Sequence, residues 1–286
     1  MERTSKGWGS GLLGVIIFSG SLPATRLAVA GFEPVFLTSA RAVIAAALGV
    51  LLLTALKARR PAKSDLGALA VVALGVVVGF PLLTALALQH VTAAHSIVFV
   101  GLLPLATAIF GVLRGGERPR PAFWIFSIIG SLSVVGFAVS RGGAGSLVGD
   151  LLMVAAIVVC GLGYAEGAVL SRRLGGWQVI CWALVLALPV MAAVAVAALP
   201  RALHGVGASA WAGLAYVSVF SMLVGFVFWY RGLAVGGIAK VGQLQLLQPF
   251  FGLALAALLL HERVALGMVA VTAVIILCVA GAKRFA

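Results

Sequence analysis

Long apolar runs constrain this chain more than any other feature of its sequence. Each run extends over about 20 residues, the length that an α-helix needs to cross the hydrocarbon core of a bilayer. Apolar residues make up 63% of the chain and charged residues only 9%, which is too few charges for the surface of a soluble domain. The runs lack the alternation that is typical of a membrane β-barrel. The sequence therefore predicts an all-α integral membrane protein.

Short polar or helix-breaking stretches separate the apolar runs and predict where the helices end. They leave room for ten transmembrane helices and for no soluble domain. We expect the first run to stay in the protein as a helix rather than to be removed as a signal peptide, because Arg26 interrupts its end. The expected helices cover residues 9–30, 34–56, 66–88, 93–113, 122–140, 149–171, 177–199, 209–230, 238–260 and 265–282.

Lysine and arginine are distributed unevenly between the two sides of such a bundle. If the N-terminus is cytoplasmic, 15 of the 20 Lys and Arg residues lie on the inner side and 3 in outer loops. Cytoplasmic loops of membrane proteins carry this kind of excess. We therefore expect a multi-pass protein of a bacterial-type inner membrane with both termini in the cytoplasm. The net charge of +13 orients the helices and does not indicate nucleic-acid binding.

One spacing of residues recurs in the two halves of the chain. Pro104 precedes Glu117-Arg118 by the same distance as Pro249 precedes Glu262-Arg263, an offset of 145 residues (249 − 104). Ala94 and Ala239, as well as Gly136 and Gly281, share this offset. Because five is an odd number, a second group of five helices enters the membrane from the opposite side. We expect two inverted five-helix repeats, residues 1–143 and 144–286, which suit alternating access in a secondary transporter.

These residues resemble the drug/metabolite transporter superfamily, in its ten-helix EamA branch. The resemblance covers the whole chain and rests on the doubled Pro-to-Glu-Arg pattern, on Arg41 early in the second expected helix, and on the stretch from Gly232-Leu233 to Ala239. Within that branch the chain is most similar to the bacterial YddG-type amino-acid exporters. The resemblance implies an inner-membrane carrier whose central cavity is built chiefly by the first, third, fourth, sixth, eighth and ninth helices. It also implies export of amino acids, aromatic ones included.

Prolines and glutamines deep in the expected helices are candidates for the transport path, because polar groups in a membrane span are costly unless they have a role. Pro104 and Pro249 lie near the middle of the fourth and ninth helices, and each frees a backbone carbonyl. We interpret them as hinges or as sources of exposed carbonyls for a substrate ammonium, with plain packing kinks as the alternative. Gln245 and Gln248 share a helix face. Their amides suit a zwitterionic substrate, or alternatively a hydrogen bond to a neighbouring helix; Gln243, nearer the cytoplasmic end, is a weaker candidate.

Aromatic and apolar residues extend this candidate site. Phe99 and Leu103 form a stripe ahead of Pro104, which is either an apolar wall of the cavity or ordinary core. The resemblance to the YddG-type exporters favours the wall, because the matching positions there line the substrate path. Tyr164 is expected to contact substrate through its ring and its hydroxyl.

Two titratable residues are candidates for gating or coupling. Glu166 lies near the cytoplasmic end of the sixth expected helix, within reach of Arg172 or Lys240. Glu166 has three possible roles: it closes the inner gate through a salt bridge, it forms an ordinary ion pair at the membrane interface, or it carries a proton. His95 opens the fourth helix on the outer side, and it either couples transport to protons or is only hydrated.

A further group of charges lies toward the outer side of the first two helices. Arg26 and Arg41 have Glu33 between them as the obvious partner. This group favours a structural cluster over a binding site for a substrate carboxylate.

The sequence predicts a transporter rather than an enzyme. It has no nucleotide-binding motif, no paired carboxylates or histidine cluster at membrane depth, and no cysteine spacing of a metal site, so we expect neither a cofactor nor a metal. The expected function is export of aromatic and other neutral amino acids by alternating access around a midplane cavity. Facilitated diffusion and proton antiport both remain open. The alternative is a broad-specificity drug or small-metabolite exporter. The expected partners are a small-molecule substrate and membrane lipid, with the protein working as a monomer.

Overall fold

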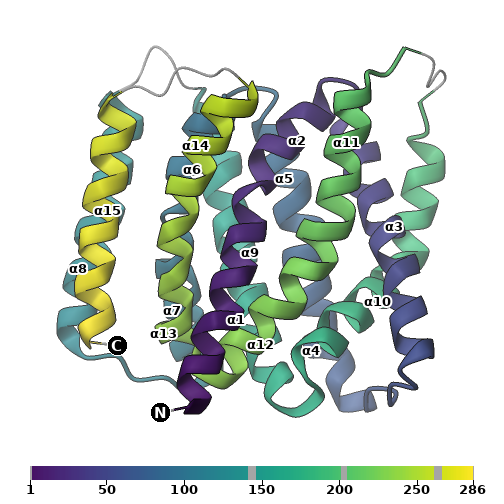
Figure 1. Cartoon of the computed structure of the whole chain (residues 1–286), viewed down its shortest axis with the longest axis horizontal. Helices are drawn as coiled ribbons and strands as arrows, with labels where there is room; N and C mark the ends of the chain where they lie inside the picture. Colours follow the sequence, from purple (N-terminus) through teal and green to yellow (C-terminus); the bar gives the residue numbers. More distant parts are fainter. Residues whose placement is uncertain (1, 141–145, 201–204, 261–265, 286) are drawn as a thin grey trace.

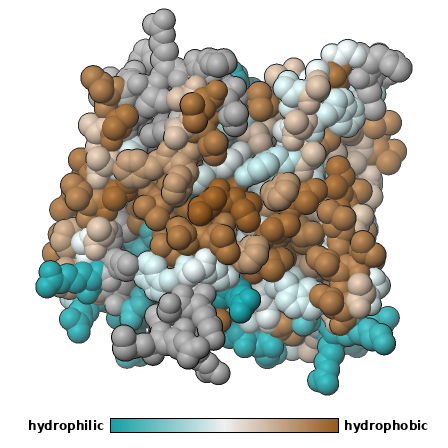
Figure 2. Space-filling model, viewed as in Figure 1, coloured by the Kyte–Doolittle hydropathy of each residue, from teal (hydrophilic) through white to brown (hydrophobic). Residues whose placement is uncertain are grey.

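The computed structural model describes residues 2–140, 146–200, 205–260 and 266–285, and these ranges form a bundle of helices without a strand (Figure 1). Helix α1 begins and α15 ends at the lower side of Figure 1. In the space-filling view, apolar residues form a broad belt and hydrophilic residues gather along the lower edge (Figure 2). The molecule therefore has the surface of a membrane protein.

The first 140 residues form helices that mostly agree with the expected ones. The helix pairs α1–α2 and α6–α7 are each interrupted, and a π-helical segment, η2, follows α4. The elements are α1 (Glu2–Ser19), α2 (Ser21–Val29), α3 (Pro34–Ala55), η1 (Lys63–Asp65), α4 (Leu66–Val72), η2 (Ala73–Gly79), α5 (Phe80–Ala87), α6 (Ala93–Val100), α7 (Leu103–Gly115) and α8 (Pro121–Ser140).

The remaining residues show similar interruptions. A second π-helical segment, η3, separates α11 from α12, and a 3₁₀ segment, η4, separates α13 from α14. The elements are α9 (Leu147–Leu174), α10 (Gly176–Ala197), α11 (Ala208–Tyr216), η3 (Val217–Val224), α12 (Gly225–Gly236), α13 (Ile238–Gly242), η4 (Gln243–Leu247), α14 (Gln248–Leu260) and α15 (Leu266–Phe285).

Six helical stretches of the described chain are long and apolar enough to cross a membrane. Shorter apolar helices lie at Leu103–Gly115, Pro121–Gly130 and Val269–Ala282. The prediction of an all-α membrane protein is thus confirmed, and the count of ten spans stays a prediction. The six stretches are Gly7–Val29, Pro34–Ala55, Lys63–Ala87, Leu147–Leu174, Gly176–Ala197 and Ala208–Gly236.

The two central prolines each stand where the helical geometry changes. Pro104 is the second residue of α7, and Pro249 is the second residue of α14. Proline suits the first turn of a helix because its missing N–H would have no intrahelical partner there. The fourth expected helix is interrupted at Gly101-Leu102, whereas the ninth continues through the 3₁₀ segment η4 into α14 without a non-helical residue.

Glycines bring α1 and α12 into close contact. A Cβ atom built on Gly232 would lie 2.7 Å from the backbone nitrogen of Gly11, and one on Gly14 would lie 3.1 Å from the Trp229 backbone. Helices in membranes use such small residues to let their backbones approach. This contact fixes Phe18 of α1 beside the aromatic residues of α12.

Candidate functional site

Five aromatic side chains from α1, α9 and α12 meet in the interior of the bundle. The ring of Phe18 lies 5.0 Å from that of Phe226, and the ring of Tyr164 lies 5.5 Å from that of Trp229, measured between centroids. Tyr230 adds a further ring 5.3 Å from Phe226. All five side chains are buried. We call this group the aromatic cluster.

Two of the predicted glutamines lie against the aromatic cluster. Gln248 donates a hydrogen bond from Nε2 to the backbone oxygen of Phe18 at 3.4 Å. Gln245 is fully buried, and its amide lies near the Tyr164 hydroxyl without a hydrogen bond of normal geometry. Within the described part of the chain, neither amide atom of Gln245 has a hydrogen-bond partner.

The aromatic cluster and the Gln245 amide offer two kinds of contact to a ligand. Aromatic faces attract cations and apolar groups, while a free amide offers two donors and an acceptor. A buried polar group without partners costs about 1–3 kcal/mol. A ligand that supplies those partners would recover that cost.

The turn ahead of Pro104 and the 3₁₀ segment ahead of Pro249 lie side by side. Pro104 at the start of α7 and Gln243 at the start of η4 both line a small hollow of about 10 Å³. Gln243 therefore belongs to the 3₁₀ segment rather than to a regular α-helix. Pro249 starts α14, and its side chain lies outside the described part of the structure. The hinge role of both prolines stays a prediction.

Phe99 and Leu103 are buried on either side of the break between α6 and α7. Both belong to the main apolar core, and neither lines the hollow at Pro104. The choice between cavity wall and ordinary core therefore stays a prediction.

His95 is buried and has an acidic partner. Its Nε2 lies 2.7 Å from Oδ1 of Asp150, a residue of the first turn of α9. Its ring centroid lies 5.4 Å from that of Phe99. The alternative that His95 is only hydrated is therefore wrong. Its role in coupling transport to protons stays a prediction. Asp150 escaped the sequence analysis because it stands at a helix start, where acids are common.

Glu166 pairs with a different arginine from the two that we expected. Arg114 of α7 donates two hydrogen bonds to its carboxylate, at 2.6 and 3.0 Å. The Glu166 side chain is 9% exposed and that of Arg114 is 52% exposed. The expectation of Arg172 or Lys240 is wrong, because α9 turns this residue toward α7.

Glu117 is a functional candidate that sequence reasoning used only as a repeat marker. Its two carboxylate oxygens accept the backbone N–H groups of Ile238 and Ala239, each at 2.8 Å. Arg172 lies 3.6 Å from the same carboxylate. A cavity of about 440 Å³ surrounds this contact, lined also by Arg118. Glu262 and Arg263, the matching residues of the second half, lie outside the described residues.

The expected cluster of Arg26, Arg41 and Glu33 does not form. Arg41 donates from Nη2 to the Val217 oxygen at 3.1 Å and to Ser221 Oγ at 3.2 Å, while Arg26 donates to the backbone oxygen of Leu88. Val217 begins the π-helical segment η3, and a π-turn changes which carbonyls have intrahelical partners. Both acceptors of Arg41 therefore lie in η3, which ties α3 to this segment.

Among the described residues, no three His, Cys, Asp or Glu side chains gather closely enough to hold an ion. Cys160, Cys181 and Cys278 are each buried and free.

The matching family and the two relatives described here are all transporters or exporters by name. The sequence profile of the EamA-like transporter family matches residues 5–139 and 147–282. The "Uncharacterized transporter YdeK" of Bacillus subtilis (strain 168) is 66% identical over 286 residues, the whole of both chains. A "Probable terminal-alkyne amino-acid exporter" of Streptantibioticus cattleyicolor is 24% identical over 258 residues, which cover 88% of this chain and 84% of that protein.

A solved structure, described only as "Crystal structure of protein", shares the fold. It superimposes with a TM-score of 0.76 at 19% identity and covers 99% of this chain and 100% of its own. The buried polar groups within an apolar helical bundle, together with the family match over nearly the whole chain, establish that this chain belongs to the EamA-like transporter family of the drug/metabolite transporter superfamily and is a membrane transporter.

Proposed function

We propose that this transporter exports amino acids, aromatic and other neutral ones, through a site formed by Gln245, Gln248, Tyr164 and the aromatic cluster. The observation that carries the proposal is the fully buried amide of Gln245, which has no hydrogen-bond partner among the described residues. An amino acid brings an ammonium donor and a carboxylate acceptor to such an amide. Its apolar side chain would pack on the rings of the cluster. The distant relative named as an amino-acid exporter supports this choice of substrate.

The two halves of the chain, residues 1–143 and 144–286, would act as inverted repeats of five helices each. The family profile matches two separate stretches of similar length. The π-helical segments η2 and η3 occupy corresponding positions, since their first residues are 144 apart (217 − 73) and their last residues 145 apart (224 − 79). Equivalent irregularities at one offset support a common origin of both halves.

Alternating access would require contacts between the halves to form and break. Arg114 with Glu166 and Glu117 with Ile238 join residues of the first half to residues of the second near the lower side of the molecule. His95 and Asp150 also join the two halves. We propose that the first two contacts hold a cytoplasmic gate closed. We also propose that Pro104 and Pro249 let α7 and α14 move as access alternates between the two sides of the membrane.

The proposed orientation in the membrane rests on the distribution of charged residues. Hydrophilic residues line the lower edge in Figure 2. We propose that this edge faces the cytoplasm, because an excess of Lys and Arg is expected on the inner side. The protein would then lie in a bacterial-type inner membrane with both termini in the cytoplasm. Phe18 of the first half and residues of the second half such as Tyr164 both contribute to the proposed site, so a monomer would contain the whole pathway.

Efflux from proteoliposomes tests the proposal. Vesicles are loaded with radiolabelled Phe, Thr, Lys or Glu, with and without a pH gradient. We expect Phe and Thr to leave faster than from protein-free vesicles. Gln245→Met should lower their rates at least tenfold, whereas Gln178→Met, at a half-buried glutamine of α10, should not. If none of the four amino acids leaves faster than from protein-free vesicles, and the protein is folded, the proposal is wrong.

The same vesicles test coupling to protons. If export is proton antiport, an imposed pH gradient changes the initial rate, and His95→Gln removes that response. If the rate ignores the gradient, the protein works by facilitated diffusion and His95 has a structural role. The aromatic cluster also suits apolar cations, so a screen of cationic drugs would follow if the amino acids fail.

A further inference from the structure

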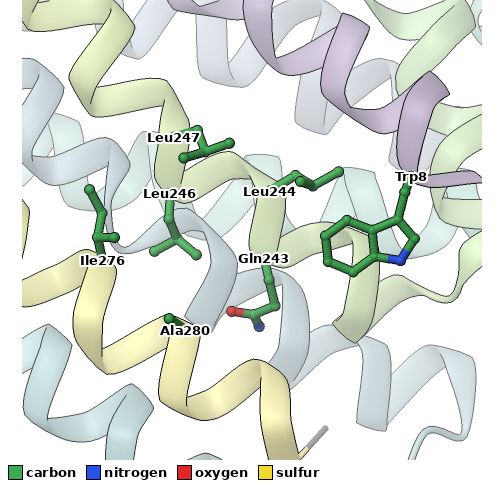
Figure 3. A pocket seen from close by; sticks show the side chains of 7 residues that line it. All are labelled: Trp8, Gln243, Leu244, Leu246, Leu247, Ile276 and Ala280. Atoms are coloured by element: carbon green, nitrogen blue, oxygen red, sulfur yellow. The ribbon is translucent and has the colours of Figure 1, made fainter. Parts of the chain in front are cut away.

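A second cavity, of about 150 Å³, lies between α1, η4 and α15 (Figure 3). Trp8 contributes from α1, leucines including Leu244 from η4, and Ile276 and Ala280 from α15. Both α1 and α15 contact η4, so η4 forms the floor of the cavity. Gln245 is not among the residues that line it, so this cavity is separate from the proposed amino-acid site.

Gln243 supplies an unsatisfied acceptor to this cavity. Its side chain is 5% exposed, and its Oε1 has no hydrogen-bond partner in the part of the chain that the structure describes. Figure 3 shows its amide between the Trp8 ring and Ala280. A buried acceptor in this state favours a ligand that brings a donor.

Water is a poor occupant of this space. A buried water typically needs two to four polar partners, whereas leucines, Ile276 and Ala280 form most of the lining. An apolar cavity of about 150 Å³ engineered into another protein stays dry and binds benzene. The space therefore suits one aromatic ring, and the single free acceptor suits one donor rather than a zwitterion.

We propose that this cavity binds a small aromatic molecule that carries one hydrogen-bond donor, as phenols and indoles do. The donor bonds to Gln243 Oε1, and the ring packs on Trp8 and the leucines of η4. Ala280 is exposed, and Leu247 and Ile276 are half-buried. The mouth thus opens at the apolar outer surface, and the ligand enters from the bilayer. The inference does not rest on amino-acid export, because it is tested by binding alone.

Fluorine NMR titration of the transporter in lipid nanodiscs tests the inference. The probes are para-fluorophenol, which has a donor, and para-fluorotoluene, which has a similar size and none. Empty nanodiscs correct for partition into lipid. We expect saturable binding of both probes, with the phenol bound roughly two- to twelvefold more tightly, the range that one hydrogen bond provides.

Four variants assign this binding to the cavity. Gln243→Leu should abolish the preference for the phenol and retain the toluene, with Gln243→Met as the substitute if the first variant fails to fold. Ala280→Phe should fill the cavity and abolish saturable binding of both probes. Ala270→Phe, at another exposed position of α15, should leave both affinities unchanged.

Three results would overturn the inference. Equal affinities of the unmodified transporter for the two probes would mean that the cavity takes any apolar group, such as a lipid acyl chain. If both Gln243 variants still bind the phenol more tightly than the toluene, Gln243 Oε1 is not the acceptor. Absence of saturable binding, or its loss in both phenylalanine variants alike, would remove the site.

Discussion

Glu117 and Ile238 are joined by a hydrogen bond of 2.8 Å between a side-chain oxygen and a backbone N–H, although 121 residues separate them in sequence. Ile238 is the first residue of α13, so its N–H has no intrahelical partner. The carboxylate thus caps a short helix from another part of the chain. Because α13 leads directly into η4, this contact also positions Gln243 and Gln245.

Replacement of Glu117 tests the importance of this cap. Glu117→Gln keeps one acceptor but removes the charge that the helix N-terminus and Arg172 both attract. We expect a loss of about 1 kcal/mol of stability, the usual value of a helix cap, seen as a lower melting temperature in detergent. Arg118→Gln, at the exposed neighbouring residue, serves as the control. Identical melting temperatures for the two variants would contradict the capping role.

Gln245 should show opposite effects on stability and on transport. Gln245→Met replaces a fully buried amide that lacks partners with an apolar side chain of similar size. Removal of an unsatisfied buried polar group is neutral or stabilising, so the melting temperature should stay equal or rise. Export should fall, because the substrate loses its hydrogen-bond partner. A variant that melts lower and still transports at the normal rate would show that Gln245 serves packing.

The pair of Arg114 and Glu166 can be examined by a double-mutant cycle. Arg114→Gln leaves the mostly buried Glu166 carboxylate without its partner, which is more damaging than loss of the whole pair. The melting temperature of Arg114→Gln should therefore be lower than that of the double variant Arg114→Gln/Glu166→Gln. If the pair closes a gate, the double variant should also change the rate of export. Additive shifts in melting temperature would show that the two residues are not coupled.

Gly167 should tolerate no side chain. A Cβ atom there would lie 2.3 Å from Cζ of Tyr230, whose hydroxyl donates to the Gly163 oxygen at 3.1 Å. Gly167→Ala should therefore destabilise the protein by about 1–3 kcal/mol, the cost of overpacking a core, and disturb the aromatic cluster. Gly9 has open space around it, so Gly9→Ala should instead stabilise α1 by roughly 0.5–1 kcal/mol. Thermal unfolding of both variants checks the contrast.

Some residues of the site could be predicted from the sequence, and the others could not, for identifiable physical reasons. Tyr164, Gln245 and Gln248 stood out because polar groups are rare in apolar runs, and the structure places all three at or beside the aromatic cluster. Phe18 and Trp229 did not stand out, because an aromatic residue in an apolar helix looks like core until its neighbours are known. Glu166 was recognised as important, yet its partner Arg114 depended on which helices meet.

The sequence by itself determined that the chain forms apolar helices in a membrane, roughly where the apolar stretches lie, and which family they resemble. These properties depend on residues that are close in sequence, because hydropathy and helix ends are local. The tertiary structure decided where the fourth helix is interrupted and where the ninth becomes 3₁₀, which arginine meets Glu166, and that Glu117 caps α13. Those outcomes depend on residues tens to more than a hundred positions apart, which only the packing of the helices brings together.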